Sequence, residues 1–307
     1  MSLSIVVVGY GRLGAALCTE LYRLRYTIKG IFGKSKTSTQ RLTHDSDIQY
    51  HDPSQYSLCR YADIVFITTP DDVIQQVCES IARDQGFTSH SVVFHCSGAL
   101  TSEILSSARK YGASTGTMHP LQSFSIQKTE QNRFKDIYIA IEGDPVAVET
   151  AKKLANDLQS HPFILQTSAK IFYHAAAVVA SNYLITLVNM SLQLLEKTGM
   201  NKHDGISLLM PLIQGTIENV KKSGTDQALT GPIARGDIDI LSKHITAIKE
   251  DIPELLDLYV WLGRYTIEIA KLSPKLSSNS VSCLEYLFNN SFGNNKSKIK
   301  NQKSENL

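Results

Sequence analysis

Short, continuously apolar runs alternate with helical patterns over the first 120 residues of the chain. The apolar runs are "LSIVVVG" (3–9), "YTIKGIF" (26–32), "ADIVFITT" (62–69), "SVVFHCSG" (91–98) and "STGTMHP" (114–120). Helical patterns lie between them, at 13–25, 72–82 and 101–110. Strands buried on both faces read as continuous apolar runs, so this alternation predicts a parallel sheet with helices on both sides.

Beyond residue 120 the pattern changes from mixed to helical. "IYIAIEG" (137–143) predicts a sixth strand, a helix should run from Pro145 to about residue 158, and "PFILQ" (162–166) is a candidate closing strand. From 168 to about 272 the pattern is helical. A chain of 307 residues suits two domains. We therefore predict an α/β domain at 1–167, an all-helical domain at 168–287, and a disordered basic tail at 288–307.

The composition excludes several classes of protein. With 42% hydrophobic and 20% charged residues, it is that of an ordinary globular chain. Of 31 basic and 29 acidic residues, four lysines and one glutamate lie in the last twelve positions, which leaves 27 basic and 28 acidic residues elsewhere. A nucleic-acid partner is not expected, because such proteins concentrate basic residues on the folded surface.

The cysteines and the N-terminus bear on the cellular compartment. Five cysteines form no CxxC pair and no metal-ligand spacing, which favours a reducing cytoplasm and no metal site. "MSLSIVVVGYG" enters a strand pattern at once, without the features of a secretion signal. The apolar segment 175–195 is interrupted by polar residues, so we expect a buried helix there and not a membrane span.

The hexapeptide "GYGRLG" follows the first predicted strand and opens the first predicted helix. In a dinucleotide-binding turn, Gly9 would make the tight turn, Gly11 would let backbone approach the pyrophosphate, and Gly14 would let helix and strand pack closely. The helix N-terminus would offer free N–H groups to the phosphates. The candidate contacts in this turn are Gly9, Tyr10, Gly11, Arg12, Leu13 and Gly14.

The end of the second predicted strand bears on the choice of cofactor. NAD-preferring proteins carry an acidic residue there, but this chain reads "FGKSKTSTQR", with Lys34, Ser35 and Lys36. Cations and hydroxyls suit a 2′-phosphate, so NADP is favoured over NAD; a solvated basic loop is the alternative. "TTPDD" (68–72) follows the next strand, which makes Thr69 and Pro70 candidate contacts to the ribose or nicotinamide.

Histidines follow two further predicted strands, in "HCSGAL" (95–100) and "MHPLQSF" (118–124). Ligands of such folds bind where strand ends open into the crevice, so Ser97 and His119 are candidate substrate contacts. Each of these residues also has a structural interpretation. Ser97 can cap the next helix, and a histidine can be a hydrogen-bonded core residue.

The helix predicted at 168–199 carries three further polar candidates. At about 100° per residue, Lys170 and His174 project within roughly 40° of one another, whereas Asn182 is rotated by about 80° from His174. Lys170 and His174 are therefore candidates for acid–base catalysis, and Asn182 for substrate binding. The alternative is an exposed lysine and a buried structural histidine.

Taken in order, the motifs "GYGRLG", "TTPDD", "HCSGAL", "GTMHPLQSF", "KIFYHAAAVVASNYL" and "GPIARGD…H" resemble an uncharacterised family of NADP oxidoreductases. That family joins a Rossmann-like domain to a helical domain of unknown function, and the resemblance covers residues 1 to about 275. It looks related to the superfamily of pyrroline-5-carboxylate reductase, ketopantoate reductase and 6-phosphogluconate dehydrogenase. The resemblance implies a C-terminal domain like that of 6-phosphogluconate dehydrogenase, and a homodimer built through it.

The resemblance also implies roles for single residues. In ketopantoate reductase and the β-hydroxyacid dehydrogenases a catalytic lysine is followed four residues later by asparagine; here Lys170 matches the lysine, but His174 replaces the asparagine. Arg235, in "GPIARGD", would suit an anionic substrate, and capping by Asp237 is the competing account of that motif.

The sequence thus predicts hydride transfer between NADP(H) and a small, anionic carbonyl, imine or hydroxy acid. The alternatives are a non-catalytic NADP-binding sensor or scaffold, and a ketopantoate- or pyrroline-5-carboxylate-reductase-like enzyme.

Overall fold

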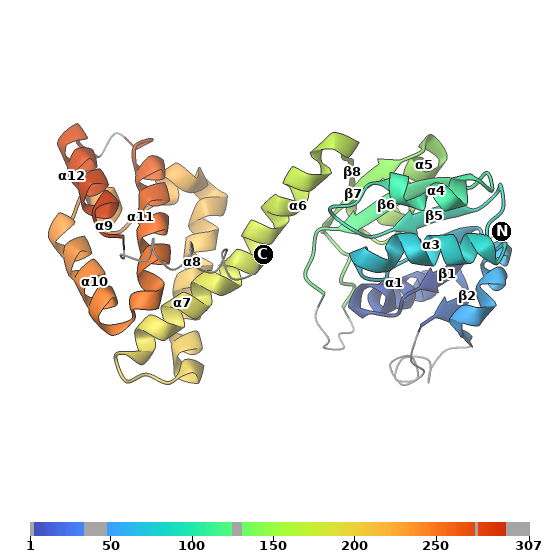
Figure 1. Ribbon diagram of the computed structural model, residues 1–307, viewed down its shortest axis with the longest axis horizontal. Helices are drawn as coiled ribbons and strands as arrows, with labels where there is room; N and C mark the ends of the chain where they lie inside the picture. The colour runs from blue at the N-terminus through green and yellow to red at the C-terminus, as the bar shows by residue number, and fades with distance from the viewer. Residues whose placement is uncertain (1–2, 34–47, 125–130, 274–275, 293–307) are drawn as a thin grey trace, which may run out of the picture. The chain divides into compact units, whose positions relative to one another are not determined.

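The computed structural model describes residues 3–33, 48–124, 131–273 and 276–292. The chain divides into two compact units, Met1–Leu184 and Ile185–Leu307 (Figure 1). The first unit therefore extends past residue 167, where the sequence pattern places the domain boundary. It includes the beginning of a long helix, whose side chains contact the sheet.

The first unit is built on an eight-stranded sheet in the order β3-β2-β1-β4-β5-β6-β7-β8. The strands are β1 (Ser4–Val8), β2 (Thr27–Phe32), β3 (Tyr50–His51), β4 (Ile64–Ile67), β5 (Val92–His95), β6 (Ser114–Pro120), β7 (Tyr138–Gly143) and β8 (His161–Ile164). This confirms the predicted α/β fold, including the closing strand β8. Sequence reasoning missed β3, which is only two residues long and carries no apolar run.

One strand pair departs from the predicted parallel sheet. β7 runs antiparallel to β6, with Thr117 opposite Glu142, whereas the other neighbouring pairs are parallel. Parallel neighbours need a crossover connection, usually a helix, but antiparallel neighbours do not. The described part of the connection between β6 and β7 contains no helix, which fits the reversed direction of β7.

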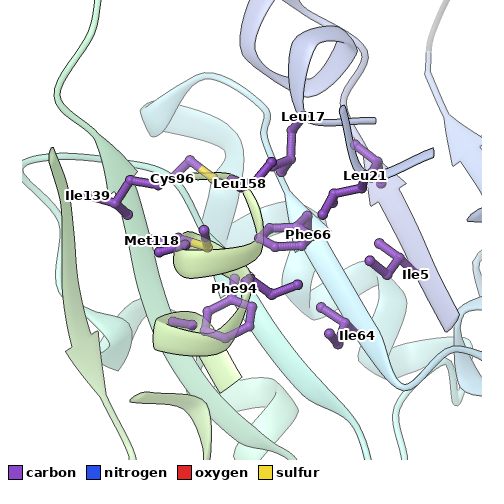
Figure 2. Packing of buried hydrophobic residues seen from close by; sticks show 14 of the residues in the cluster. Ile5, Leu17, Leu21, Ile64, Phe66, Phe94, Cys96, Met118, Ile139 and Leu158 are labelled. Carbon is purple, nitrogen blue, oxygen red and sulfur yellow. The ribbon is translucent and has the colours of Figure 1, made fainter. Parts of the chain in front are cut away.

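Hydrophobic clusters cover both faces of this sheet, as continuous apolar runs require. Ile5, Phe66 and Phe94 point to one face and pack with Leu17 and Leu21 of α1 (Arg12–Arg23) (Figure 2). On that face α5 (Pro145–Asp157) adds further side chains. The opposite face packs against η1 (Pro53–Tyr61), α3 (Ile74–Arg83) and α4 (Ser106–Arg109), beside η2 (Asp71–Val73) and η3 (Ser102–Leu105). Successive strand residues alternate between the two clusters.

A long helical segment follows the sheet. It consists of η4 (Thr167–Ala169), α6 (Lys170–Val178), a π-helical turn η5 (Val179–Tyr183) and α7 (Leu184–Glu196). By length and composition alone, Thr167–Glu196 is apolar enough to cross a membrane, with a mean hydropathy of 1.6. The sequence predicts a buried helix at 175–195, and that expectation is wrong for the single chain, since Tyr183 is 57% exposed and Ile185 69%.

The second unit is helical. Besides α7 it contains α8 (Lys202–Ala228), α9 (Pro232–Arg235), α10 (Ile238–Asp251), η6 (Pro253–Leu255), α11 (Leu256–Ala270) and α12 (Ser278–Asn289). Its core joins Leu241, Val260 and Phe288, and Phe288 packs against Gly263, where a Cβ atom would lie 2.1 Å from the Phe288 ring. Helix α12 thus includes Phe288 and Asn289, which the sequence pattern assigns to the tail. Residues 293–307 of the predicted tail lie outside the described residues.

Candidate active site

The glycine turn between β1 and α1 has the geometry that the sequence pattern predicts. Gly9 adopts φ +98°, and a Cβ atom there would lie 2.8 Å from the backbone nitrogen of Thr69. A Cβ atom at Gly14 would lie 2.2 Å from the carbonyl oxygen of Gly9, so this glycine allows helix and strand to pack. At Gly11 a Cβ atom would meet no atom of the described residues within 4 Å, so nothing that the structure describes fills that side of the turn.

The groups around the turn fit the phosphates and ribose of a dinucleotide. Gly11 is the N-cap of α1; among the described residues no side chain caps this helix end, and the first turn of α1 holds no acidic residue. Its N–H groups and positive dipole end are therefore available to an anion. The hydroxyl oxygen of Thr69 is buried without a hydrogen-bond partner among the described residues, and Pro70 beside it is exposed.

The remaining predicted cofactor contacts differ in position. Tyr10 and Leu13 are half-buried and pack on the core, while Arg12 is exposed. Burial raises the pKa of Tyr10, so its phenol is neutral. Lys34, Ser35 and Lys36, on which the NADP preference rests, lie outside the described residues.

Three polar side chains form a row across β5, β6 and β7. Thr117 pairs with His95 of β5 and with Glu142 of β7, and residues paired in this way share one face of a sheet. All three are buried. His95 is a structural member of the row: the Ser97 amide donates to its Nδ1 (3.1 Å), so the imidazole donates from Nε2 to the Thr101 carbonyl (3.0 Å). This is the structural alternative foreseen for such a histidine.

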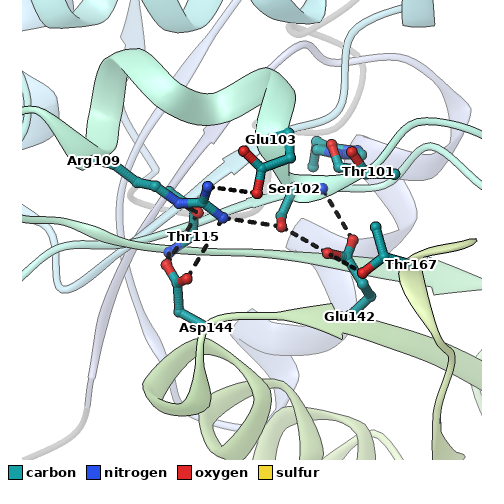
Figure 3. Close-up of polar contacts among 9 residues, drawn as sticks. Thr101, Ser102, Glu103, Arg109, Thr115, Glu142, Asp144 and Thr167 are labelled. Carbon is teal, nitrogen blue, oxygen red and sulfur yellow. Dashed lines mark hydrogen bonds and ion pairs between the residues drawn. The ribbon is translucent and has the colours of Figure 1, made fainter.

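Glu142 is held by a network of polar groups. The amide and hydroxyl of Ser102 donate to its carboxylate at 2.9 and 2.7 Å, and the Thr167 hydroxyl donates at 3.3 Å (Figure 3). Arg109 extends the network, since it donates to Ser102 (3.2 Å) and forms an ion pair with Asp144 (3.5 Å). Such bonds compensate a buried carboxylate for its lost hydration.

Lys170 enters the same row from the first turn of α6. It is 1% exposed, and its Nζ donates to the Thr117 hydroxyl (3.0 Å) and to the Ser97 carbonyl (3.3 Å). Burial lowers its pKa, while the charge of Glu142 is the largest effect that raises it. The lysine is thus a buried group beneath the site, and not the exposed first-turn residue of the structural alternative.

His119 and His174 both lie close to Gly98. A Cβ atom at Gly98 would lie 2.8 Å from Nε2 of His119 and 2.7 Å from Cδ2 of His174. The centroids of the two rings are 6.4 Å apart. Tyr173 contacts His119 from α6, with its hydroxyl 2.7 Å from Nδ1. The structure therefore brings the side chains of Lys170, His174 and His119 to the segment that contains Ser97 and Gly98.

The other predicted substrate contacts are less open or lie elsewhere. The Ser97 hydroxyl donates to Asp71 (2.6 Å) and accepts from the amides of Ala99 and Leu100, so the turn itself uses this side chain. Asn182 is exposed in the π-helical turn, which changes its rotation relative to His174 from that of a regular helix. Arg235 belongs to the second unit, is exposed, and pairs with Asp237 (2.8 Å), whose side chain makes no capping bond to α10.

Sequence reasoning missed Tyr173, Thr117 and Glu142. The signal was present for Thr117, because Thr115, Thr117 and His119 alternate with Gly116 and Met118 and so mark a polar face of β6. No comparable signal marked Glu142, because its approach to Thr117 depends on the reversed direction of β7.

The buried His95 and the half-buried His119 predict that the protein loses stability in acid. Burial lowers the pKa of His95 to about 4; burial, aided by the charges of Lys170 and His174, lowers that of His119 to about 4. Histidine in an unfolded chain has a pKa of about 6.5. Stability from these groups is therefore complete above pH 6.5 and lost as the pH falls toward 4, because the unfolded chain takes up protons that the folded chain excludes.

The expected loss is about 2 to 3 kcal/mol per histidine between pH 7.5 and 4.5. Urea denaturation across this range measures it, with wild type compared with a His119→Asn variant. The variant should show the shallower pH dependence, and an equal slope in both proteins would contradict the assignment of a neutral His119.

Comparisons with known proteins agree with this architecture. A Rossmann-like domain profile matches residues 1–120, and the profile of a domain of unknown function (DUF2520) matches residues 137–266. These matches confirm the predicted combination of a Rossmann-like domain with a C-terminal domain of unknown function. None of the curated proteins shows significant similarity to the chain.

Solved structures share the fold over most of the chain. A protein of Bacteroides fragilis described as a putative NADP oxidoreductase is 23% identical, with a TM-score of 0.71 over 86% of this chain and 97% of its own. Protein TM1727 of Thermotoga maritima is 26% identical, with a TM-score of 0.65 over 87% and 98%. The pyrroline carboxylate reductase of Plasmodium falciparum, solved with NADP bound, is 14% identical, with a TM-score of 0.53 over 94% and 97%.

Proposed function

We propose that the chain is an NADP-dependent oxidoreductase that transfers a hydride between NADP(H) and a small, anionic carbonyl, imine or hydroxy-acid compound. One observation carries this proposal. The glycine turn after β1 and the His119–His174 pair beside Gly98 both lie at the carboxyl edge of the parallel strands, where ligands of such folds bind. A dinucleotide on the turn would have its reactive end directed along this edge.

The residues of the chain have separate parts in this proposal. Gly9, Gly11, Gly14 and the N-terminus of α1 would hold the pyrophosphate, and the free hydroxyl of Thr69 would bind a ribose. NADPH, when bound, supplies the hydride. The preference for NADP over NAD rests on Lys34, Ser35 and Lys36 in the sequence, and agrees with the NADP bound to the Plasmodium reductase.

We assign different roles to the two predicted acid–base residues. His174 lies beside Gly98 and can move a proton to or from a substrate placed there. Lys170 is buried beneath, so we assign its ammonium to a fixed charge that favours an anionic substrate and a developing oxyanion. Arg235 remains a proposed contact for the substrate's anionic group.

The oligomeric state and the cellular location are also part of the proposal. The exposed apolar side chains of Ile171, Phe172, Val179 and Ile185 support a homodimer formed through the long helix, since large apolar patches usually mark interfaces. All five cysteines are free, which supports a cytoplasmic location.

Binding and turnover assays test the function. NADPH should bind more tightly than NADH, and it should be oxidised by at least one compound in a panel of oxo acids and imino acids. His174→Ala should lower turnover about a hundredfold or more without weakening NADPH. Tighter binding of NADH would contradict the cofactor preference. Binding of NADPH without hydride transfer to any compound would favour the alternative, a non-catalytic sensor or scaffold.

A further inference from the structure

The contact between Tyr173 and His119 restricts where the hydrogen on the imidazole lies. The Tyr173 hydroxyl is 2.7 Å from Nδ1 of His119, and the two rings meet edge to face at 5.4 Å. A phenol is a good donor and a poorer acceptor, and an unprotonated imidazole nitrogen is a good acceptor. Tyr173 therefore donates to Nδ1. In a neutral imidazole the remaining hydrogen must then be on Nε2.

The environment of His119 favours that neutral form. His119 is half-buried. The groups that face it are Lys170, Tyr173 and His174 of α6, Asp71 of η2 and His95 of β5. Burial and the nearby positive charge of Lys170 both lower its pKa, to about 4. Burial also raises the pKa of Tyr173 to about 12, so the phenol keeps its hydrogen near neutral pH.

Nε2 is the ring nitrogen of His119 that lies near Gly98. Nε2 would lie 2.8 Å from a Cβ atom at that position, and Gly98 has none. A side chain at this position would press against the ring, so glycine is what lets Nε2 lie this close to the loop. A ligand atom beside Gly98 would therefore meet an N–H donor on one side, with the buried charge of Lys170 below.

These properties discriminate between the substrate classes of the proposed function. The oxygen of a ketone has lone pairs that accept from Nε2–H, and it gains negative charge as a hydride arrives at the carbon. A protonated imine has no free lone pair on nitrogen with which to accept a hydrogen bond from Nε2–H. A neutral N–H donor therefore suits C=O and not C=N⁺.

We propose that Tyr173 fixes His119 as the Nε2–H tautomer, and that His119 donates this hydrogen to the carbonyl oxygen of a small oxo acid. The inference rests on the proposed function and narrows it to ketone reduction, with oxidation of the hydroxy acid as the reverse. In this assignment His119, in place of His174, gives the proton to the substrate, and His174 borders the same place. Tyr173 is a positioning residue that acts through His119.

The proton and electron balance of the reduction is complete with these groups. The carbonyl carbon receives a hydride, and the electron pair of the C=O π bond moves to the oxygen. The oxygen takes the proton from Nε2 of His119. As Nε2 releases its proton, Nδ1 takes the proton of the Tyr173 hydroxyl. Solvent then returns a proton to Nε2, and Nδ1 returns its proton to the Tyr173 oxygen, which restores the starting tautomer. The products are the hydroxy acid and oxidised cofactor.

The tautomer can be measured without turnover. In the full-length protein labelled with ¹⁵N-histidine, protonated and unprotonated ring nitrogens give separate resonances, and those missing from a His119→Asn variant belong to His119. The wild type should show Nε2–H with an unprotonated Nδ1 at pH 7.5. Tyr173→Phe, which removes only the hydroxyl, should produce a mixture of tautomers. Tyr61→Phe is the control, since Tyr61 is 63% exposed on η1.

The substrate class is tested with NADPH on two panels, 2- and 3-oxo acids and cyclic imino acids. Turnover should occur with an oxo acid, and Tyr173→Phe should lower its kcat about a hundredfold with NADPH affinity unchanged. An Nδ1–H tautomer in the wild type would overturn the role of Tyr173, and faster reduction of cyclic imino acids would overturn the substrate class. NADPH binding without turnover on either panel would instead refute the proposed function and with it the substrate class, whereas the NMR result would still decide the tautomer.

Discussion

Gly14→Ala should destabilise the α/β unit by about 3 kcal/mol, whereas Gly11→Ala should leave stability unchanged and weaken NADPH binding about tenfold or more. A methyl group at Gly14 would lie 2.2 Å from the Gly9 carbonyl oxygen and 2.5 Å from the Thr68 hydroxyl, so helix and strand would have to separate. At Gly11 the methyl group meets no atom within 4 Å in the described part of the chain, but it would enter the space proposed for the pyrophosphate.

The two variants form a matched pair, because each adds one methyl group to the same turn. Thermal denaturation measures the first effect, and titration with NADPH measures the second. Equal NADPH affinity of Gly11→Ala and wild type would show that the open side of this turn does not hold the phosphates. An unchanged melting temperature for Gly14→Ala would contradict the packing seen at that residue.

Gly98→Ala should reduce turnover about a hundredfold while NADPH binding and the melting temperature stay close to wild type. Its methyl group would lie 2.7 Å from the His174 ring and 2.8 Å from Nε2 of His119, so both rings must move away from the place proposed for the substrate. Steady-state kinetics and NADPH titration check this expectation.

Gly215→Ala is the control for this effect, since a Cβ atom there meets nothing within 4 Å and helix α8 favours alanine over glycine. It should behave as wild type in both assays. Normal turnover by Gly98→Ala would place the reacting atoms elsewhere and contradict the site.

The sequence predicted the sheet and the glycine turn well because both depend on local patterns. β1, β4 and β5 are buried on both faces and therefore read as unbroken apolar runs. Gly9 and Gly14 occupy positions where any side chain would clash, so their identity alone indicated the turn.

The prediction was less complete where long-range contacts decide the structure. Helical spacing paired Lys170 with His174 but could not show that Lys170 lies under Ser97 and Thr117, because those contacts cross more than fifty residues of sequence. Nor could it show Tyr173 beside His119. The position of Asn182 was calculated for a regular helix, and no apolar period marks a π-helical turn.

That π-helical turn determines where the long helix can lose a single residue. A π turn holds about one residue more than an α turn, so loss of a single residue within Val179–Tyr183 would leave an uninterrupted α-helix. A deletion elsewhere in α6 or α7 would instead rotate every later side chain by about 100° relative to the earlier ones. Among relatives of this protein, a one-residue gap in the long helix should therefore be tolerated at this turn, without disturbing the placement of Lys170, Tyr173 and His174 before it.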